Sequence, residues 1–164
     1  MDNILFCSCG RRVKLLMNFH KSMAGCGNIV ATDLSPVAPA LFMADKVHLV
    51  PRIDAPDYFD RILEICEKED VKAITTLIDP EIEILSKHRE ELLSKGVLPL
   101  CPAEWTAHLC FDKYEMFKHL SSKGVRTVLT YDTLDGLKDG LKKGEISFPV
   151  FMKPINGSGS VGIG

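Results

Sequence analysis

The sequence predicts an α/β protein whose first hundred residues form a parallel sheet wound by helices. Short apolar runs alternate with segments of helical spacing as far as Pro102, which is typical of strands joined by right-handed helical crossovers. The clearest runs of the buried-strand type are Asn3–Cys7 and Val71–Ile78. After about residue 112 a shorter helix–strand–helix–strand pattern follows, which predicts a second, smaller α+β unit.

Composition and charge are those of an ordinary soluble protein. The chain has 164 residues, 46% of them hydrophobic and 26% charged, which is enough for one domain or one and a half with a real core. A net charge of −2 argues against a nucleic-acid or membrane partner bound through bulk positive charge. No apolar run approaches the roughly 20 residues that span a bilayer, and Met1-Asp2-Asn3 lacks the basic start of a signal peptide. We therefore expect a cytoplasmic protein.

The cysteines do not predict a disulfide framework or a metal site. They are scattered along the chain, and the only close pair is a Cys-x-Cys. No His/Cys spacing resembles a zinc site. We expect reduced thiols, several of them in apolar runs, at Cys7, Cys9, Cys26, Cys66, Cys101 and Cys110.

The first unit is expected to contain five strands with helices between them. The expected strands are Asn3–Cys7, Asn28–Thr32, Lys46–Val50, Val71–Ile78 and Val97–Cys101. The expected helices are Arg11–Met23, a short helix or turn over Ala38–Ala44, a helix that follows Asp57, and one from Pro80 to about Ser94. Asp57 and Asp79 are the expected N-caps, with Pro80 at the first helical position.

A glycine turn and an acidic residue flank the first predicted helix. The order of strand, turn at Gly10, helix, strand and Asp33 is that of a dinucleotide-binding unit. One glycine stands where the dinucleotide fingerprint has three, so an NAD-linked oxidoreductase is disfavoured. Asp33 either faces a ligand from the carboxyl end of its strand or caps the turn that follows it.

Two further acidic residues follow the strand that ends at Ile78. Asp79 and Glu81 lie beyond its carboxyl end, where open α/β sheets bind their ligands. A capping role alone would also explain Asp79, so both interpretations stay open.

The second unit is expected to begin after a linker at residues 102–111. Its expected elements are a helix capped by Asp112 and Glu115, a strand at Arg126–Tyr131, a helix at Leu134–Lys143 and a strand at Phe148–Met152. Lys113 falls in the first turn of the first helix, where a cation opposes the helix dipole. It is therefore either a ligand of an anion or an ordinary surface lysine.

The last residues form a glycine-rich loop after a lysine. Lys153 ends an apolar run, and the loop that follows contains Gly157, Ser158, Gly159, Ser160 and Gly162. Backbone N–H groups in such a loop form an anion-binding concavity, and the lysine adds a point charge for a phosphate oxygen. A flexible linker or tail is the alternative, but the buried-looking run and the lysine before the loop favour nucleotide phosphate binding. The loop is not a Walker A motif, because no Gly-Lys-Ser/Thr follows it.

Taken together, these motifs resemble the ATP-grasp superfamily. A Rossmann-like domain is followed by Cys110-Phe111-Asp112-Lys113 and then by a strand carrying Lys153 and the glycine loop. Within the superfamily, the chain is similar to the carbamoyl-phosphate synthase large subunit over essentially its whole length. The segments that carry this resemblance are Gly10-Arg11-Arg12, Ala31-Thr32-Asp33, Ala38-Pro39-Ala40, Ala44-Asp45 and Leu77-Ile78-Asp79-Pro80-Glu81.

The resemblance implies a domain organisation and a set of site residues. Residues 1–101 would be a Rossmann-like pre-ATP-grasp domain, and residues 112–164 the first, incomplete part of an ATP-grasp domain that stops in the glycine loop. Lys113, Lys153 and Gly157–Gly164 would contact ATP. The acceptor-substrate pocket would involve Gly10, Arg11, Asp33, Asp79 and Glu81. The ligands of Mg²⁺ and the catalytic residues would lie further along, so no residue of this chain is expected to be catalytic or to bind metal.

The function implied is that of an ATP-dependent ligase. Such enzymes phosphorylate a carboxylate with ATP, and an amine or similar nucleophile then attacks the acyl-phosphate. We expect residues 112–164 alone to leave apolar faces uncovered, and therefore to be poorly ordered or packed against a second chain. A second copy of the chain or a missing C-terminal half would cover these faces. We expect no catalysis by this chain alone. The alternative is a non-catalytic Rossmann-like module that binds a small ligand and carries a vestigial tail.

Overall fold

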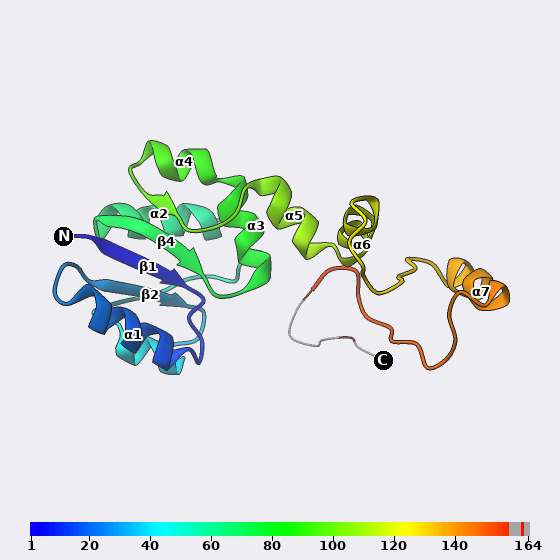
Figure 1. The fold of residues 1–164 in the computed structure, drawn as a ribbon. Helices are drawn as coiled ribbons and strands as arrows, with labels where there is room; N and C mark the ends of the chain where they lie inside the picture. Colours follow the sequence, from blue (N-terminus) through cyan, green and yellow to red (C-terminus); the bar gives the residue numbers. More distant parts are fainter. Residues whose placement is uncertain (158–161, 163–164) are drawn as a thin grey trace. The chain divides into compact units, whose positions relative to one another are not determined.

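The computed structural model describes residues 1–157 and residue 162 of the chain. The chain divides into two compact units, Met1–Glu104 and Trp105–Gly164. Figure 1 shows the ribbon, with the sheet confined to the first unit. Each unit is described by itself.

The first unit contains one five-stranded sheet in the order β3-β2-β1-β4-β5. Every neighbouring pair is parallel. The strands are β1 (Asn3–Cys7), β2 (Ile29–Asp33), β3 (Lys46–Leu49), β4 (Val71–Thr76) and β5 (Leu98–Pro99). The predicted α/β class with a parallel sheet is therefore confirmed, and the five strands lie where the sequence placed them, several of them shorter.

Helices cover both faces of this sheet. They are α1 (Val13–Met23), the 3-10 helix η1 (Pro39–Met43), α2 (Tyr58–Lys68), α3 (Asp79–Lys87) and α4 (Arg89–Ser94). One core layer joins the sheet to α1 and η1 through Phe6, Leu16 and Leu41. The other joins it to α2, α3 and α4, with Leu5 at its centre.

Burial on both faces of the sheet explains why β1 is apolar from Ile4 to Cys7. Successive strand residues point to opposite faces, and here Leu5 and Cys7 enter one core layer while Ile4 and Phe6 enter the other. The ring of Phe6 packs edge-on against the ring of Phe19 in α1, with 4.8 Å between their centroids. Burial on both faces is the condition under which a strand loses the polar alternation.

The strand order creates a switch point between β1 and β4. The chain leaves β1 towards β2 on one side and leaves β4 towards β5 on the other, while β1 and β4 are neighbours with Cys7 opposite Thr76. Their carboxyl ends therefore lie side by side (Figure 1). In open α/β sheets this is where ligands bind.

The start of α3 differs from the prediction. Asp79 is not the N-cap: Ile78 precedes the helix, and Asp79 and Pro80 are its first two residues. The extended backbone of Ile78, with φ −135° and ψ 140°, is the conformation that a residue adopts just before a helix. At α2, Asp57 does occupy the N-cap position, but its side chain makes no capping hydrogen bond.

The single helix predicted from Pro80 to Ser94 is two helices that meet at His88. The backbone of His88, with φ −95° and ψ 18°, interrupts the regular helix. Its ring stacks on the ring of Phe59 in α2, with 3.8 Å between the centroids. This contact with another helix is a tertiary feature that the local spacing did not reveal.

The described part of the second unit is helical. It contains α5 (Glu104–Phe111), α6 (Lys113–Ser122) and α7 (Leu134–Lys143). The segment predicted as a linker thus includes α5. Apolar residues occupy most positions of α5, so it lacks the one-sided spacing by which a helix is recognised. The Asp112 carboxylate accepts the N–H groups of Tyr114 and Glu115, both at 2.9 Å, as its predicted capping role requires.

The two strands predicted in the second unit are wrong. Neither Arg126–Tyr131 nor Phe148–Met152 forms a strand. A strand needs a partner for its N–H and C=O groups, and within residues 105–157 no such partner is present. Val128 is 82% exposed and Phe151 is 71% exposed, so these apolar runs lie uncovered.

Candidate functional site

The turn between β1 and α1 is held by Asp33 at the end of β2. Its Oδ2 accepts the N–H of Gly10 at 2.8 Å, and its Oδ1 accepts the N–H of Ser35 at 2.9 Å. Gly10 has φ +52°, a left-handed conformation that favours glycine. Both oxygens of Asp33 are thus engaged with backbone groups, and the residue organises this edge of the sheet.

The same turn presents positive charge. The carbonyl of Gly10 accepts the N–H of Ala40 at 2.9 Å, which fixes η1 against the turn. Arg11 and Arg12 follow and are exposed, and the first turn of α1 has no acidic residue. The N-terminus of α1 therefore combines the positive end of the helix dipole with two arginines.

Glu81 is the fully buried acidic residue of this edge. It lies in the first turn of α3 and is 0% exposed. The hydroxyl of Thr76, at the end of β4, donates to Glu81 Oε2 and accepts the N–H of Ile78 at 3.3 Å. Thr76 thus links the carboxylate to the backbone before α3. Glu81 Oε1 is buried without a hydrogen-bond partner among the described residues.

The surroundings of Glu81 make its carboxyl group a weak acid. Burial raises the pKa of Glu81 from 4.5 to about 7; the Ser8 hydroxyl, as a hydrogen-bond donor, lowers it, and the charge of Asp33 raises it further. Desolvation therefore outweighs the hydrogen bond that favours the charged form. The predicted residues Gly10, Asp33 and Glu81 come together at the carboxyl ends of β1, β2 and β4, while Asp79 is exposed at the start of α3.

In the second unit, Lys113 reaches the beginning of the glycine loop. Its Nζ donates to the carbonyl oxygens of Ile155 and Gly157, both at 3.0 Å. Its backbone N–H also donates to the Ile155 oxygen at 3.1 Å. Two segments more than forty residues apart in sequence therefore meet at this lysine.

The rest of the predicted phosphate site is only partly within the described structure. Lys153 is exposed, and Gly157 and Gly162 have φ values of +113° and +71°. Such values suit glycine and allow backbone N–H groups to converge. The predicted residues Ser158, Gly159 and Ser160 lie outside the described residues.

Comparison with known protein families identifies the first unit. The family described as PylC-like, N-terminal domain, matches residues 4–100. The chain belongs to this family. A comparison with curated protein sequences finds no match.

Solved structures share the fold of this PylC-like chain at low identity. An L-amino acid ligase from Bacillus licheniformis is 16% identical with a TM-score of 0.73, and the chain covers 37% of it while 99% of the chain is matched. N5-carboxyaminoimidazole synthetase from Staphylococcus aureus, complexed with ADP, is 17% identical with a TM-score of 0.66; the chain covers 39% of it and is itself 96% matched. The biotin carboxylase domain of 2-oxoglutarate carboxylase from Hydrogenobacter thermophilus, in complex with MgADP, ADP and bicarbonate, is 20% identical with a TM-score of 0.66; the chain covers 36% of it and is itself 98% matched.

The chain thus spans little more than a third of the length of these structures. At this level of identity the likeness shows the fold alone: the parallel sheet of the first unit matches the Rossmann-like N-terminal domain of these structures. The predicted Rossmann-like N-terminal domain is confirmed. The specific likeness to carbamoyl-phosphate synthase is not confirmed by these comparisons.

Two residues of the PylC-like domain escaped the sequence analysis. Ser8 and Thr76 were not singled out, although both contact Glu81 from the ends of neighbouring strands. The sequence signal for these two residues is weak. Each is a hydroxyl residue at the end of a strand, and the sequence alone does not show that the two strands are neighbours.

Cysteine and metal chemistry gain no support. All six cysteines are free, and burial raises the pKa of Cys9 to about 11 and that of Cys66 to about 12, which leaves both thiols protonated. Among the described residues, no group of three or more His, Cys, Asp or Glu side chains could hold a metal ion. Nor does that part of the chain contain a helix with the length and apolar character that crossing a membrane requires.

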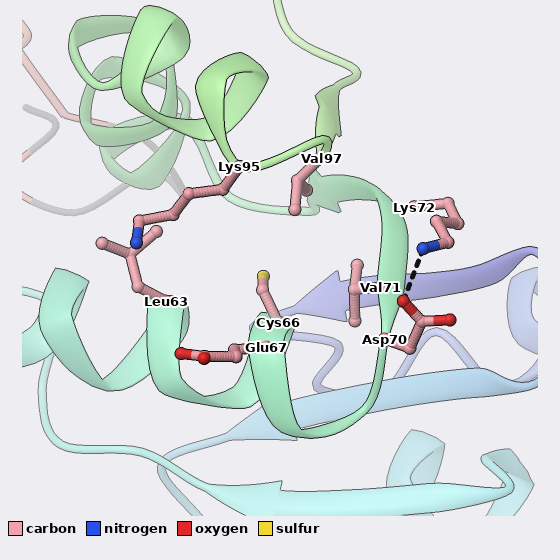
Figure 2. Close-up of a pocket in the computed structure, with 8 residues that line it drawn as sticks. All are labelled: Leu63, Cys66, Glu67, Asp70, Val71, Lys72, Lys95 and Val97. Atoms are coloured by element: carbon pink, nitrogen blue, oxygen red, sulfur yellow. Dashed lines mark hydrogen bonds and ion pairs between the residues drawn. The ribbon is translucent and has the colours of Figure 1, made fainter.

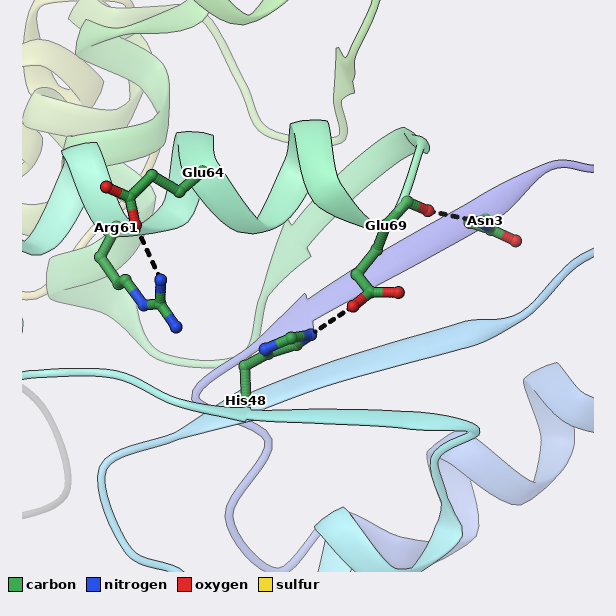
Figure 3. Close-up of polar contacts among 5 residues, drawn as sticks. All are labelled: Asn3, His48, Arg61, Glu64 and Glu69. Atoms are coloured by element: carbon green, nitrogen blue, oxygen red, sulfur yellow. Dashed lines mark hydrogen bonds and ion pairs between the residues drawn. The ribbon is translucent and has the colours of Figure 1, made fainter.

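Two other polar features lie in the first unit. A hollow of about 290 Å³ lies near the starts of β4 and β5. Figure 2 shows the residues that line it: Leu63, Cys66, Glu67, Asp70, Val71, Lys72, Lys95 and Val97. His48 Nε2 lies 2.8 Å from Glu69 Oε1, and Asn3 Nδ2 donates to the Glu69 carbonyl at 2.6 Å. Figure 3 shows both contacts. These contacts tie β3 and β1 to the end of α2, and we regard them as structural.

Proposed function

We propose that the chain supplies the N-terminal domain and the first nucleotide-binding segment of an ATP-dependent ligase of the ATP-grasp type. The ligase joins a carboxylate to an amine or a similar nucleophile through an acyl-phosphate. The family match and the fold of the solved structures support this proposal. Within this proposal, the segments that resemble the large subunit of carbamoyl-phosphate synthase favour that subgroup.

The contact between Lys113 and the start of the glycine loop carries the nucleotide part of the proposal. An ammonium group and glycines of left-handed φ are the groups that bind phosphate oxygens, and both occur where Lys113 Nζ meets the Gly157 carbonyl. Lys113, Lys153 and the loop from Gly157 would bind the phosphates of ATP, with Lys153 alternatively at the adenine edge. ATP would supply the phosphoryl group that activates the carboxylate. The resemblance implies that the ligands of Mg²⁺ lie further along the polypeptide, so we assign none of them to this chain.

The acceptor substrate would bind at the switch point of the first unit. Gly10, Arg11, Asp33, Asp79 and Glu81 all lie at or just beyond the carboxyl ends of the strands. There Asp33 would shape the pocket through the backbone groups that it holds. Arg11 and the N-terminus of α1 would attract an anionic group such as the acceptor's carboxylate.

The cellular setting is also a proposal. We infer a cytoplasmic protein that acts on a small molecule and binds neither nucleic acid nor membrane. A second copy or a further stretch of polypeptide would cover the apolar side chains that the second unit exposes, among them Val128, Phe148, Phe151 and Met152. Large exposed apolar patches usually mark such an interface.

Nucleotide binding tests the proposal. In the complete protein that contains this chain, Lys113→Gln should weaken MgATP binding in calorimetry by about tenfold, since a hydrogen bond to a charged group contributes roughly 1.5 kcal/mol or more. Lys123→Gln, at the other end of α6, is the matched control and should bind as the wild type does. Equal binding by wild type and both variants would exclude Lys113 from the site. A protein that binds a small ligand but no nucleotide would favour the non-catalytic module.

A further inference from the structure

Glu81 is a buried carboxylate that lacks a counter-charge. It is 0% exposed, and the hydroxyl of Thr76 donates to its Oε2. Oε1 is left without a partner among the described residues. Buried carboxylates are normally paired or fully hydrogen-bonded, because an isolated buried charge is costly. An unsatisfied oxygen of this kind calls for an explanation.

The groups that face Glu81 do not supply that counter-charge. Asp33 on β2 carries the same charge and opposes ionisation of Glu81. Cys7 on β1, whose own pKa is raised by burial and then by Glu81, is neutral. Ser8 and Thr76 offer neutral hydroxyl groups only. No lysine, arginine or histidine forms an ion pair with Glu81 within residues 1–157.

The position of Glu81 is that of a ligand-binding group. It lies in the first turn of α3 and contacts Thr76 at the carboxyl end of β4, the strand beside β1 at the switch point. Ser8, in the first of these turns, has φ +47°, which is uncommon for a residue other than glycine and is often found at functional sites. Asp33 is less available to a ligand, because both of its carboxylate oxygens already accept backbone N–H groups.

We propose that Glu81 and the Ser8 hydroxyl bind the protonated amino group of a small-molecule substrate at this edge of the sheet. An ammonium group has three N–H donors and no acceptor, so it satisfies Oε1 and the Ser8 oxygen together and supplies the missing positive charge. This inference rests on the proposed function, because only that function makes the ligand a substrate. It adds that the ligand is a primary amine. The site itself involves no nucleotide.

The carboxyl resonance of Glu81 provides the test. A ¹³C-detected pH titration of the protein, labelled at glutamate Cδ, gives the pKa of Glu81 without ligand, and the resonance is assigned by its loss in Glu81→Gln. The titration is repeated with an excess of ethylammonium, ethanolamine or L-alanine, at an ionic strength kept constant with sodium chloride. Because a cation next to a carboxylate favours its charged form, the amines should lower the pKa of Glu81 by about 1 to 3.

Controls separate this outcome from the alternatives. Glu90→Gln removes an exposed carboxylate of α4 and should leave the response unchanged, whereas Ser8→Ala should weaken it. If Glu81→Gln does not fold, Glu81→Asp keeps the carboxylate and moves its resonance out of the glutamate region. An unchanged or raised pKa with all three amines, or an equal response to ethanol, would overturn the proposal and identify Glu81 as a protonated structural acid.

The result is independent of the nucleotide test. An amine response in a protein that binds no MgATP would support this site and refute the ligase. The reverse combination would leave the ligase standing and remove Glu81 from its substrate site.

Discussion

Lys113 Nζ lies 3.0 Å from the carbonyl oxygen of Gly157, a residue 44 positions further along the chain. A second bond of the same length joins it to the Ile155 carbonyl. The lysine therefore binds the glycine loop through acceptor groups of the backbone, in a position where phosphate oxygens would compete for the same ammonium group. Lys113 therefore contacts the start of the loop at Ile155 and Gly157.

Removal of the Lys113 ammonium group should loosen the start of the loop in the nucleotide-free protein. We expect Lys113→Gln to speed hydrogen exchange of the amides at residues 155–157 by roughly fivefold, because local opening no longer breaks two bonds to a charged donor. Lys123→Gln should show wild-type exchange in the same segment. Mass spectrometry of peptic peptides measures both. Identical exchange in the two variants would mean that the contacts with Ile155 and Gly157 do not hold the loop.

We expect Asp33 to stabilise the folded protein even when no ligand is bound. Asp33→Ala leaves the N–H groups of Gly10 and Ser35 without their acceptor, which should cost about 2 to 3 kcal/mol in the free energy of unfolding. Asp33→Asn keeps one good acceptor oxygen and should lose about half as much. Urea unfolding followed by circular dichroism gives both values. A wild-type stability of Asp33→Ala would show that these two bonds contribute nothing net.

The stability of the first unit should fall as the pH rises towards neutral. The pKa of Glu81 is raised from 4.5 to about 7 in the folded protein, so between these values the folded state binds a proton that the unfolded state has released. Stability from this group is complete below about pH 4.5 and is lost as the pH rises through 7, by about 3 kcal/mol in total.

Glu81→Gln provides the comparison, since it cannot ionise. The difference in unfolding free energy between wild type and Glu81→Gln should change in favour of the variant from pH 5 to pH 8. A bound amine should reduce this change, because it stabilises the carboxylate. A difference that stays constant across this range would show that the pKa of Glu81 is not raised.

The sequence predicted the first unit well because its signals are local. The run that became β1 is buried on both faces and is therefore apolar from Ile4 to Cys7, and a helix start such as Asp112 is encoded within four residues. The strands expected at Arg126–Tyr131 and Phe148–Met152 failed because strand formation depends on a neighbour that local sequence cannot supply. Helix α5 was missed because its apolar residues are not confined to one side.

The acidic residues of the candidate site could be predicted from the sequence, but their hydrogen bonds and burial could not. Asp33 ends β2, whereas Asp79 and Glu81 follow β4, and these positions alone indicated the edge of the sheet. Which acid is buried, which is occupied by backbone groups and which is exposed depends on the register of β1 and β4, where Cys7 lies opposite Thr76. That register brings Thr76 and Ser8 to Glu81, and no spacing in the sequence encodes it.

The most direct test of the central claim is ADP formation by the complete protein with panels of carboxylates and amines. We predict that MgATP is converted to ADP only when a carboxylate acceptor is present. With an ¹⁸O-labelled carboxylate, one labelled oxygen should appear in the phosphate, as an acyl-phosphate requires. Lys153→Glu should abolish this turnover while the first unit stays folded, and Lys143→Glu, an exposed lysine of α7, should retain it. Undiminished ADP formation by Lys153→Glu, or phosphate free of the label, would contradict the account.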